Sequence, residues 1–278
     1  FICSLTTPPP TPPADEAPGA PILVISSSSN PFGRYYAEIL RAEGLNEFTA
    51  TDISLITPEI LAGYDVAILG EMPLTSSQVA MLTDWVSGGG SLVAMRPDKQ
   101  LTALLGLNDQ SSTLANAYLQ VNPTSAPGAG IVSDTIQFHG AADLYSAAGA
   151  STIATLFSDA TTGTTSPAVT IASVGTFGGQ AAAFTFALAR SLVYTPQGNP
   201  AWSRQERDGI APIRSDDLFF GAAGGDPQPD WVDLNKVAIP QADEQQRLLA
   251  NLLLHLNRAR KPFPRFWYLP RSAKAALV

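Results

Sequence analysis

The chain has 278 residues, of which 45% are hydrophobic and 14% are charged, and this is enough apolar sequence for one large globular domain or two small ones. Lys and Arg number 16 against 24 Asp and Glu. The resulting net charge of -8 excludes the basic surface that nucleic-acid binding needs and disfavours binding to anionic membranes.

Residues 1–21 are predicted to form a stiff linker, because seven of the 23 prolines fall there and such a segment cannot bury a core. Within it, Cys3 is a candidate for lipidation or for the tail of a signal peptide, although Ile2 is larger than the residue that usually precedes a lipidated cysteine. As the single cysteine, it excludes an internal disulfide and a four-cysteine zinc site. The low charge content is typical of exported bacterial proteins, so we expect an extracellular or cell-surface location. No apolar run reaches the length of about 18 residues that spans a membrane.

From residue 22 onward, apolar runs alternate with helical patterns, as in a sheet whose parallel strands are buried on both faces. The predicted strands are 22–25, 48–51, 65–70 and 91–95. The predicted helices begin after Asn30, at Thr57, at the Thr75–Gln78 capping box and after Asp98. Four such units predict an α/β fold with a doubly wound, mainly parallel, flavodoxin-like sheet.

The following segment has the alternating pattern of antiparallel strands. These strands are predicted at 118–121, 131–138, 152–157, 168–174 and 180–186. An irregular stretch over 196–235 precedes a leucine-rich helix over 243–260, so we expect antiparallel additions to the sheet and a closing C-terminal helix. The predicted organisation is a Pro/Thr-rich linker at 1–21, an α/β domain at 22–261, and a linker with the start of a following element at 262–278.

Polar residues follow several predicted strands at their carboxyl ends, which is the edge where such sheets bind ligands. They are Ser27, Ser28, Asn30, Glu71, Arg96 and Asp98. The serines and Asn30 are candidates for binding an anion or sugar hydroxyls, and the alternative is a polar turn with a helix cap. The sequences that cradle phosphates, G-x-G-x-x-G and GK[ST], are absent. Glu71, Arg96 and Asp98 either bind a polar ligand or pair with one another, and we favour pairing.

Further candidates lie later in the chain. His139 ends a predicted strand and either faces a cleft or is a satisfied loop histidine, and Trp202 is a candidate sugar contact. The acidic residues of the irregular stretch are candidate Ca²⁺ ligands, with turn and cap chemistry as the alternative; they are Asp216, Asp217, Asp226 and Asp230. Apart from this possible Ca²⁺ site, we expect no cofactor.

The segment YDVAILGEMPLTSSQVAMLTDWVSGGGSLVAMRPD, residues 64–98, resembles the class I glutamine amidotransferase-like superfamily, and residues 167–191 fit the same family. The resemblance covers roughly residues 22–260 and is closest to non-catalytic relatives attached to secreted carbohydrate-active proteins. Catalytic members place a cysteine on the turn after a strand, whereas this chain has Met95-Arg96-Pro97-Asp98 there. The tail, residues 265–278, looks like the lead-in to a polysaccharide deacetylase-like domain.

This resemblance implies a non-catalytic accessory or scaffold domain of an exported bacterial surface protein, docking or supporting carbohydrate-active or adhesive modules. The expected partners are a neighbouring domain of the same longer chain and a cell-surface polysaccharide or other surface proteins. One alternative is a metal-dependent glycan hydrolase or deacetylase, and another is a structural subunit of a cell-surface assembly.

Overall fold

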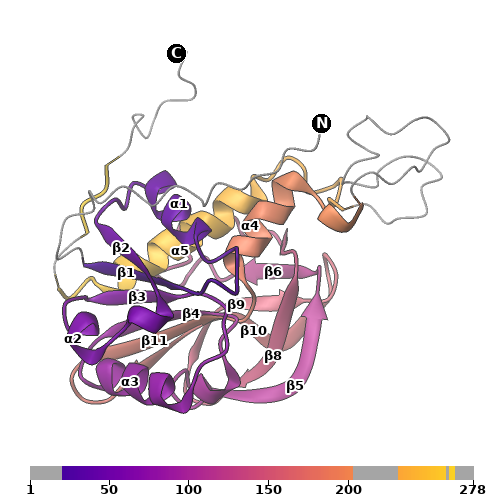
Figure 1. The fold of residues 1–278 in the computed structure, drawn as a ribbon. Coiled ribbons are helices and arrows are strands. Elements are labelled where there is room, and N and C mark those ends of the chain that lie inside the picture. The colour runs from indigo at the N-terminus through magenta and orange to yellow at the C-terminus, as the bar shows by residue number, and fades with distance from the viewer. Residues whose placement is uncertain (1–20, 203–230, 261–262, 267–278) are drawn as a thin grey trace, which may run out of the picture.

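The computed structural model describes residues 21–202, 231–260 and 263–266, which form a mixed α/β fold with a C-terminal helix (Figure 1). The larger sheet has nine strands in the order β2-β1-β3-β4-β11-β10-β9-β6-β7, and a second sheet pairs β5 with β8. The strands are β1 (Ile22–Ser26), β2 (Phe48–Asp52), β3 (Val66–Leu69), β4 (Ser91–Met95), β5 (Leu107–Ala115), β6 (Tyr118–Val121), β7 (Ile136–Gln137), β8 (Ala141–Ala147), β9 (Ser151–Phe157), β10 (Gly163–Val174) and β11 (Gly179–Phe184). The helices are α1 (Tyr35–Ala42), α2 (Pro58–Leu61), α3 (Ser76–Ser87), α4 (Leu188–Gln197) and α5 (Gln241–Leu256), with short 3-10 turns η1 (Ile53–Leu55), η2 (Lys99–Leu101) and η3 (Pro200–Trp202).

The larger sheet has a parallel half and an antiparallel half. Strands β2, β1, β3, β4 and β11 pair in parallel, whereas β10, β9, β6 and β7 continue the sheet by antiparallel pairing. The α/β class, the C-terminal helix and the antiparallel additions predicted from the sequence are therefore confirmed. The predicted parallel sheet accounts for one half of the observed one.

Helices cover both faces of the parallel half, because its central strands β1, β3 and β4 are mostly apolar and bury side chains alternately on each face. One core joins Ile22, Val24 and Ile68 to α1 and α5, and a second joins Leu23 and Leu69 to α2 and α3. Figure 1 shows α1 and α5 on one side of these strands and α2 and α3 on the other. The leucine stripe of α5, predicted from its spacing, is buried in the first core.

The structure corrects several predicted elements. Helix α1 begins at Tyr35, because the Asn30 side chain accepts a hydrogen bond from the Phe32 N–H and thus closes a turn in place of capping the helix. The helix expected after Asp98 is only the short turn η2. Of the strand predicted at 131–138, only β7 is observed. Strands β5 and β8 and helix α4 were not predicted.

At the far edge of the sheet, two glutamines of α5 bond the backbone of β7. The N–H of Gln137 donates to Oε1 of Gln241 at 2.5 Å, and Nε2 of Gln245 donates to the Gln137 carbonyl at 2.8 Å. Both glutamines are buried, so this edge of the sheet is covered by polar side chains of the C-terminal helix.

Candidate functional site

A cleft lies at the carboxyl ends of β1, β3 and β4. This is the edge of the sheet at which the sequence predicts ligand binding. Its cavity volume is about 480 Å³. The polar residues that line it are Ser29, Asn30, Glu71, Arg96, Asp98, Lys99, Asp143 and Arg190. We call it the Arg96 cleft, because that side chain connects the acidic residues from two different parts of the chain.

Arg96 is the first residue after β4, and its backbone has a positive φ of 37°. Its N–H donates to the Phe184 carbonyl at 2.7 Å, which holds the turn against β11. A non-glycine residue at positive φ is strained, and such strain persists only where the surroundings determine the conformation. The sharp turn directs the guanidinium into the cleft.

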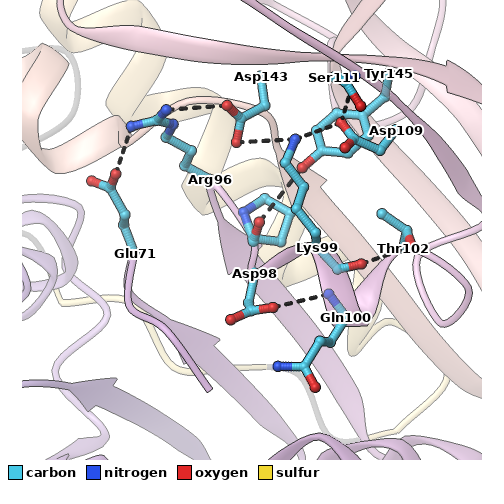
Figure 2. A network of polar contacts seen from close by, with 11 residues as sticks. Glu71, Arg96, Asp98, Lys99, Gln100, Thr102, Asp109, Ser111, Asp143 and Tyr145 are labelled. Atoms are coloured by element: carbon cyan, nitrogen blue, oxygen red, sulfur yellow. Dashed lines mark hydrogen bonds and ion pairs between the residues drawn. The ribbon is translucent and has the colours of Figure 1, made fainter. Parts of the chain in front are cut away.

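The guanidinium of Arg96 lies between two carboxylates (Figure 2). Its Nη1 contacts Oε1 of Glu71 at 2.8 Å, and its Nη2 contacts Oδ1 of Asp143 at 3.1 Å. The predicted pairing of Glu71 with Arg96 is thus present. Asp143, which comes from β8, was missed because strand β8 itself was not predicted.

Two further cations complete the network. Nζ of Lys99 lies 3.5 Å from Oδ2 of Asp143 and 2.6 Å from Oδ1 of Asp109, and it sits 4.3 Å from the centre of the Tyr145 ring. Nη2 of Arg190 lies 3.3 Å from Oε2 of Glu71. This last contact is an ion pair without hydrogen-bond geometry, since Oε2 has no hydrogen-bond partner among the described residues. Acidic and basic side chains therefore alternate along the cleft.

The network perturbs the basic groups. Partial burial lowers the pKa of Arg96, but the hydrogen bond and charge of Asp143, together with Glu71, outweigh burial and raise the pKa overall. Burial alone would lower the pKa of Lys99. Its hydrogen bonds to Asp109 and Tyr145 outweigh burial, so the pKa of Lys99 is raised overall. The Lys99 ammonium in turn lowers the pKa of Asp109. Both cations are thus held in their charged forms.

Asp98 lines the same cleft but pairs with backbone groups. Its Oδ2 accepts from the Leu74 N–H at 2.9 Å, and its Oδ1 accepts from the Gln100 N–H at 2.9 Å. The expected pairing of Asp98 with Arg96 is therefore not observed. Asp98 joins the loop before α3 to the turn after β4 and so fixes the position of Arg96.

The serine cluster is mostly occupied by local contacts. The Ser27 and Ser29 hydroxyls bond each other at 2.8 Å, and the Ser28 N–H donates to Oδ2 of Asp52 at 3.1 Å. Asn30 donates from Nδ2 to the Glu71 carbonyl at 2.8 Å. Of the predicted serine and asparagine candidates, the structure brings only Asn30 to the cleft, where Ser29 joins it.

The remaining predicted candidates lie elsewhere. His139 is 2% exposed and stacks on Trp231 with a centroid distance of 4.1 Å, away from the Arg96 cleft. Burial lowers its pKa to about 4. Trp202 ends the turn η3, and the candidate calcium ligands Asp216, Asp217, Asp226 and Asp230 lie outside the described residues. Within the described ranges, no group of three His, Cys, Asp or Glu is placed to hold a metal ion.

None of the helices in the described part of the chain has the length and apolar character needed to cross a bilayer.

Comparison with known proteins identifies structural neighbours only. No protein-family model matches the chain, and no curated protein matches it. An α-L-fucosidase isoenzyme 2 from Paenibacillus thiaminolyticus superposes with a TM-score of 0.50 at 12% identity, covering 64% of this chain and 30% of the fucosidase. A β-galactosidase from Bacillus circulans sp. alkalophilus gives a TM-score of 0.48 at 13% identity, covering 69% and 33%. The chain spans about a third of the length of these enzymes, and the likeness concerns the fold alone.

The fucosidase corrects the family resemblance. It is a glycoside hydrolase, so the assignment to the class I glutamine amidotransferase-like superfamily, with its flavodoxin-like label, is wrong. The expected non-catalytic accessory or scaffold role rested on that assignment and is corrected with it. The motif behind the assignment has a local structural cause, because a Cβ at Gly90 would overlap the ring of Trp85.

Proposed function

We propose that this chain is part of a glycan hydrolase and that the Arg96 cleft contacts the glycan. The observation that carries the proposal is the carboxylate pair, Glu71 and Asp143, held on either side of the Arg96 guanidinium within one open cleft. Glycoside hydrolysis uses two carboxyl groups, about 5 to 10 Å apart, one as acid and one as nucleophile or base. A single guanidinium between two carboxylates sets a separation on this scale.

The contacts suggest a role for each carboxylate. Both oxygens of Asp143 face cations, Arg96 and Lys99, which favours its service as the nucleophile or base. Glu71 is then left for the role of the acid, through Oε2, which accepts no hydrogen bond from the described residues. It is covered by Arg190, and a sugar must displace that side chain to reach it.

The cleft also has the composition of a site for polyhydroxyl ligands. Guanidinium, ammonium, amide and carboxylate groups supply donors and acceptors from five segments of the chain, and the acidic and basic residues balance in number. The Nε atoms of Arg96 and Arg190 are buried without hydrogen-bond partners among the described residues, so a ligand reaches these two donors only by moving the arginine side chains. The neighbours include a β-galactosidase, an exo-β-1,4-mannosidase and an α-L-fucosidase, and we extend the glycosides on which such enzymes act to this chain.

The test is hydrolysis of chromogenic β-galactosides, β-mannosides and α-L-fucosides by the full chain, between pH 4 and pH 8. We expect Glu71→Gln and Asp143→Asn each to lower kcat at least about a hundredfold, as loss of an acid-base group does. Asp134→Asn serves as the matched control, because Asp134 is an exposed residue outside the cleft. Hydrolysis that survives both cleft substitutions, or no turnover of any of the three substrates, would reject the proposal.

Treatment with a chelator tests whether the hydrolysis depends on a metal ion. The carboxylate mechanism needs no ion at the Arg96 cleft, so we expect activity to persist after dialysis against EDTA. Loss of activity with EDTA, restored by Ca²⁺ or Zn²⁺, would instead point to ligands outside the described residues.

A further inference from the structure

A second groove lies at the opposite edge of the parallel strands, and no part of the proposed function uses it. It is bordered by residues that precede β3 and β4, together with α2, α3 and the segment after α5. Its cavity volume is about 520 Å³, within the range of about 300 to 1,000 Å³ typical of small-molecule sites. We call it the Trp85 groove, and its side chains include Tyr64, Asp65, Met81, Asp84, Trp85 and Arg260.

The Gly88–Gly90 triplet shapes this groove. Gly90 lies against the indole of Trp85, where any Cβ would overlap the ring. Gly89 has a φ of 112°, and a Cβ there would come within 2.9 Å of the Phe177 carbonyl oxygen. Because only glycine fits at both positions, the triplet lets an aromatic ring lie directly on the backbone at the groove.

The polar groups of the Trp85 groove differ in how far they are already bonded. Arg260 pairs with Asp65 at 2.8 Å and also donates to the Gly89 carbonyl. By contrast, no described residue hydrogen-bonds or ion-pairs with the Tyr64 hydroxyl, the exposed Asp84 carboxylate or Nε1 of Trp85. Two aromatic residues with a phenolic hydroxyl, an indole N–H and a carboxylate available for bonding therefore share one groove.

This combination selects a class of ligand. Aromatic rings pack on apolar C–H faces, and their polar ends, with a carboxylate, bond hydroxyl groups. Two carboxylates against one guanidinium leave the lining net negative, which disfavours phosphates, sulfates and uronic acids. We infer that the Trp85 groove binds a neutral carbohydrate, separately from the Arg96 cleft. The groove stands on its own contacts, and only the choice of a carbohydrate rests on the proposed function.

The test is calorimetric titration of the full chain with β-1,4-linked glucose, mannose and galactose trisaccharides, with tri-galacturonic acid as the charged comparison. Asp84→Asn and Tyr64→Phe each remove one bonding group and keep the side-chain shape, so we expect each to weaken binding of a neutral trisaccharide about five- to tenfold. Asp243→Asn is the matched control, since Asp243 lies in the first turn of α5 outside the groove. This control should leave the affinity unchanged.

Each other outcome counts against the inference. Binding that Arg96→Lys abolishes and the groove variants leave intact would place the sugar in the Arg96 cleft, which rejects the second site and leaves the proposed function standing. Tighter binding of tri-galacturonic acid would contradict the charge argument. No binding at millimolar concentrations, or a groove substitution that changes the molecular mass in light scattering and not sugar affinity, would show that the groove has another occupant.

Discussion

At the scale of single residues, Arg96 has an unfavourable backbone conformation and His139 has an unfavourable environment. Arg96 keeps a positive φ of 37° and Glu71 and Asp143 bind both ends of its guanidinium. His139 is buried with neither ring nitrogen hydrogen-bonded within the described residues. The strained backbone of Arg96 positions a charged side chain in the cleft. The buried His139 lowers the stability of the fold by an amount that depends on pH.

The buried histidine predicts how stability varies with pH. Burial lowers the pKa of His139 from 6.5 to about 4, so the unfolded chain binds more protons than the folded chain between these values. Stability is therefore lost as the pH falls from about 6.5 to about 4, by at most about 3 kcal/mol. Urea unfolding at pH 7 and pH 5 should show this drop in the native chain and a smaller one in His139→Phe. Burial and Arg258 also lower the pKa of His255, so His255→Gln is the control for a second histidine. If His139→Phe loses as much stability between pH 7 and pH 5 as the native chain does, His139 is not the cause of the drop.

At the scale of elements, periodic patterns were the most reliable guide. The continuous apolar runs of β1, β3 and β4 and the leucine stripe of α5 were predicted, because burial leaves a clear trace in the spacing of apolar residues. Strand β5 has no such trace, since after Leu107 its side chains are mostly exposed. It is defined by pairing with β8, and β8 carries Asp143. The Arg96 cleft could thus be predicted for its β3 and β4 residues, but its β8 contribution depends on a long-range pairing.

The cap of α3 offers a test at this scale. The Gln78 N–H donates to the Thr75 hydroxyl at 3.3 Å, and the Thr75 N–H donates to Oε1 of Gln78 at 2.9 Å. Thr75→Ala removes the first bond and should lower the free energy of unfolding by about 1 kcal/mol. The neighbouring Ser76→Ala, inside the same first turn, should have a much smaller effect in the same denaturant titration. Equal losses would mean that the capping box does not stabilise the helix.

At the scale of the whole molecule, the end of the described chain is tied back to its first α/β unit. Arg265 contacts the buried Glu43 at 2.6 Å, and the Phe266 N–H donates to the Gly44 carbonyl at 2.8 Å. Gly44 has a φ of 72°, and a Cβ there would come within 2.6 Å of the Phe266 carbonyl oxygen. Residues more than 200 positions apart thus form one packed corner next to α1.

Loss of the contact between Arg265 and Glu43 should lower the free energy of unfolding. Arg265→Ala leaves the Glu43 carboxylate buried without that cation, and we expect a loss of about 3 kcal/mol in thermal or urea unfolding. The double substitution Glu43→Gln with Arg265→Ala should recover part of that loss, because the unpaired buried charge is gone. If the double variant is less stable than Arg265→Ala, the charge of Glu43 is not the cause.

The glutamine contacts at β7 limit what the antiparallel half of the sheet can do. A strand edge with free amide and carbonyl groups is a template for strands of other molecules, and such recruitment leads to aggregation. Here β7 is two residues long, and its outward backbone groups are already bonded to Gln241 and Gln245. A foreign strand would first have to pull the C-terminal helix away, so the fold carries its own protection against fibrous growth along this side.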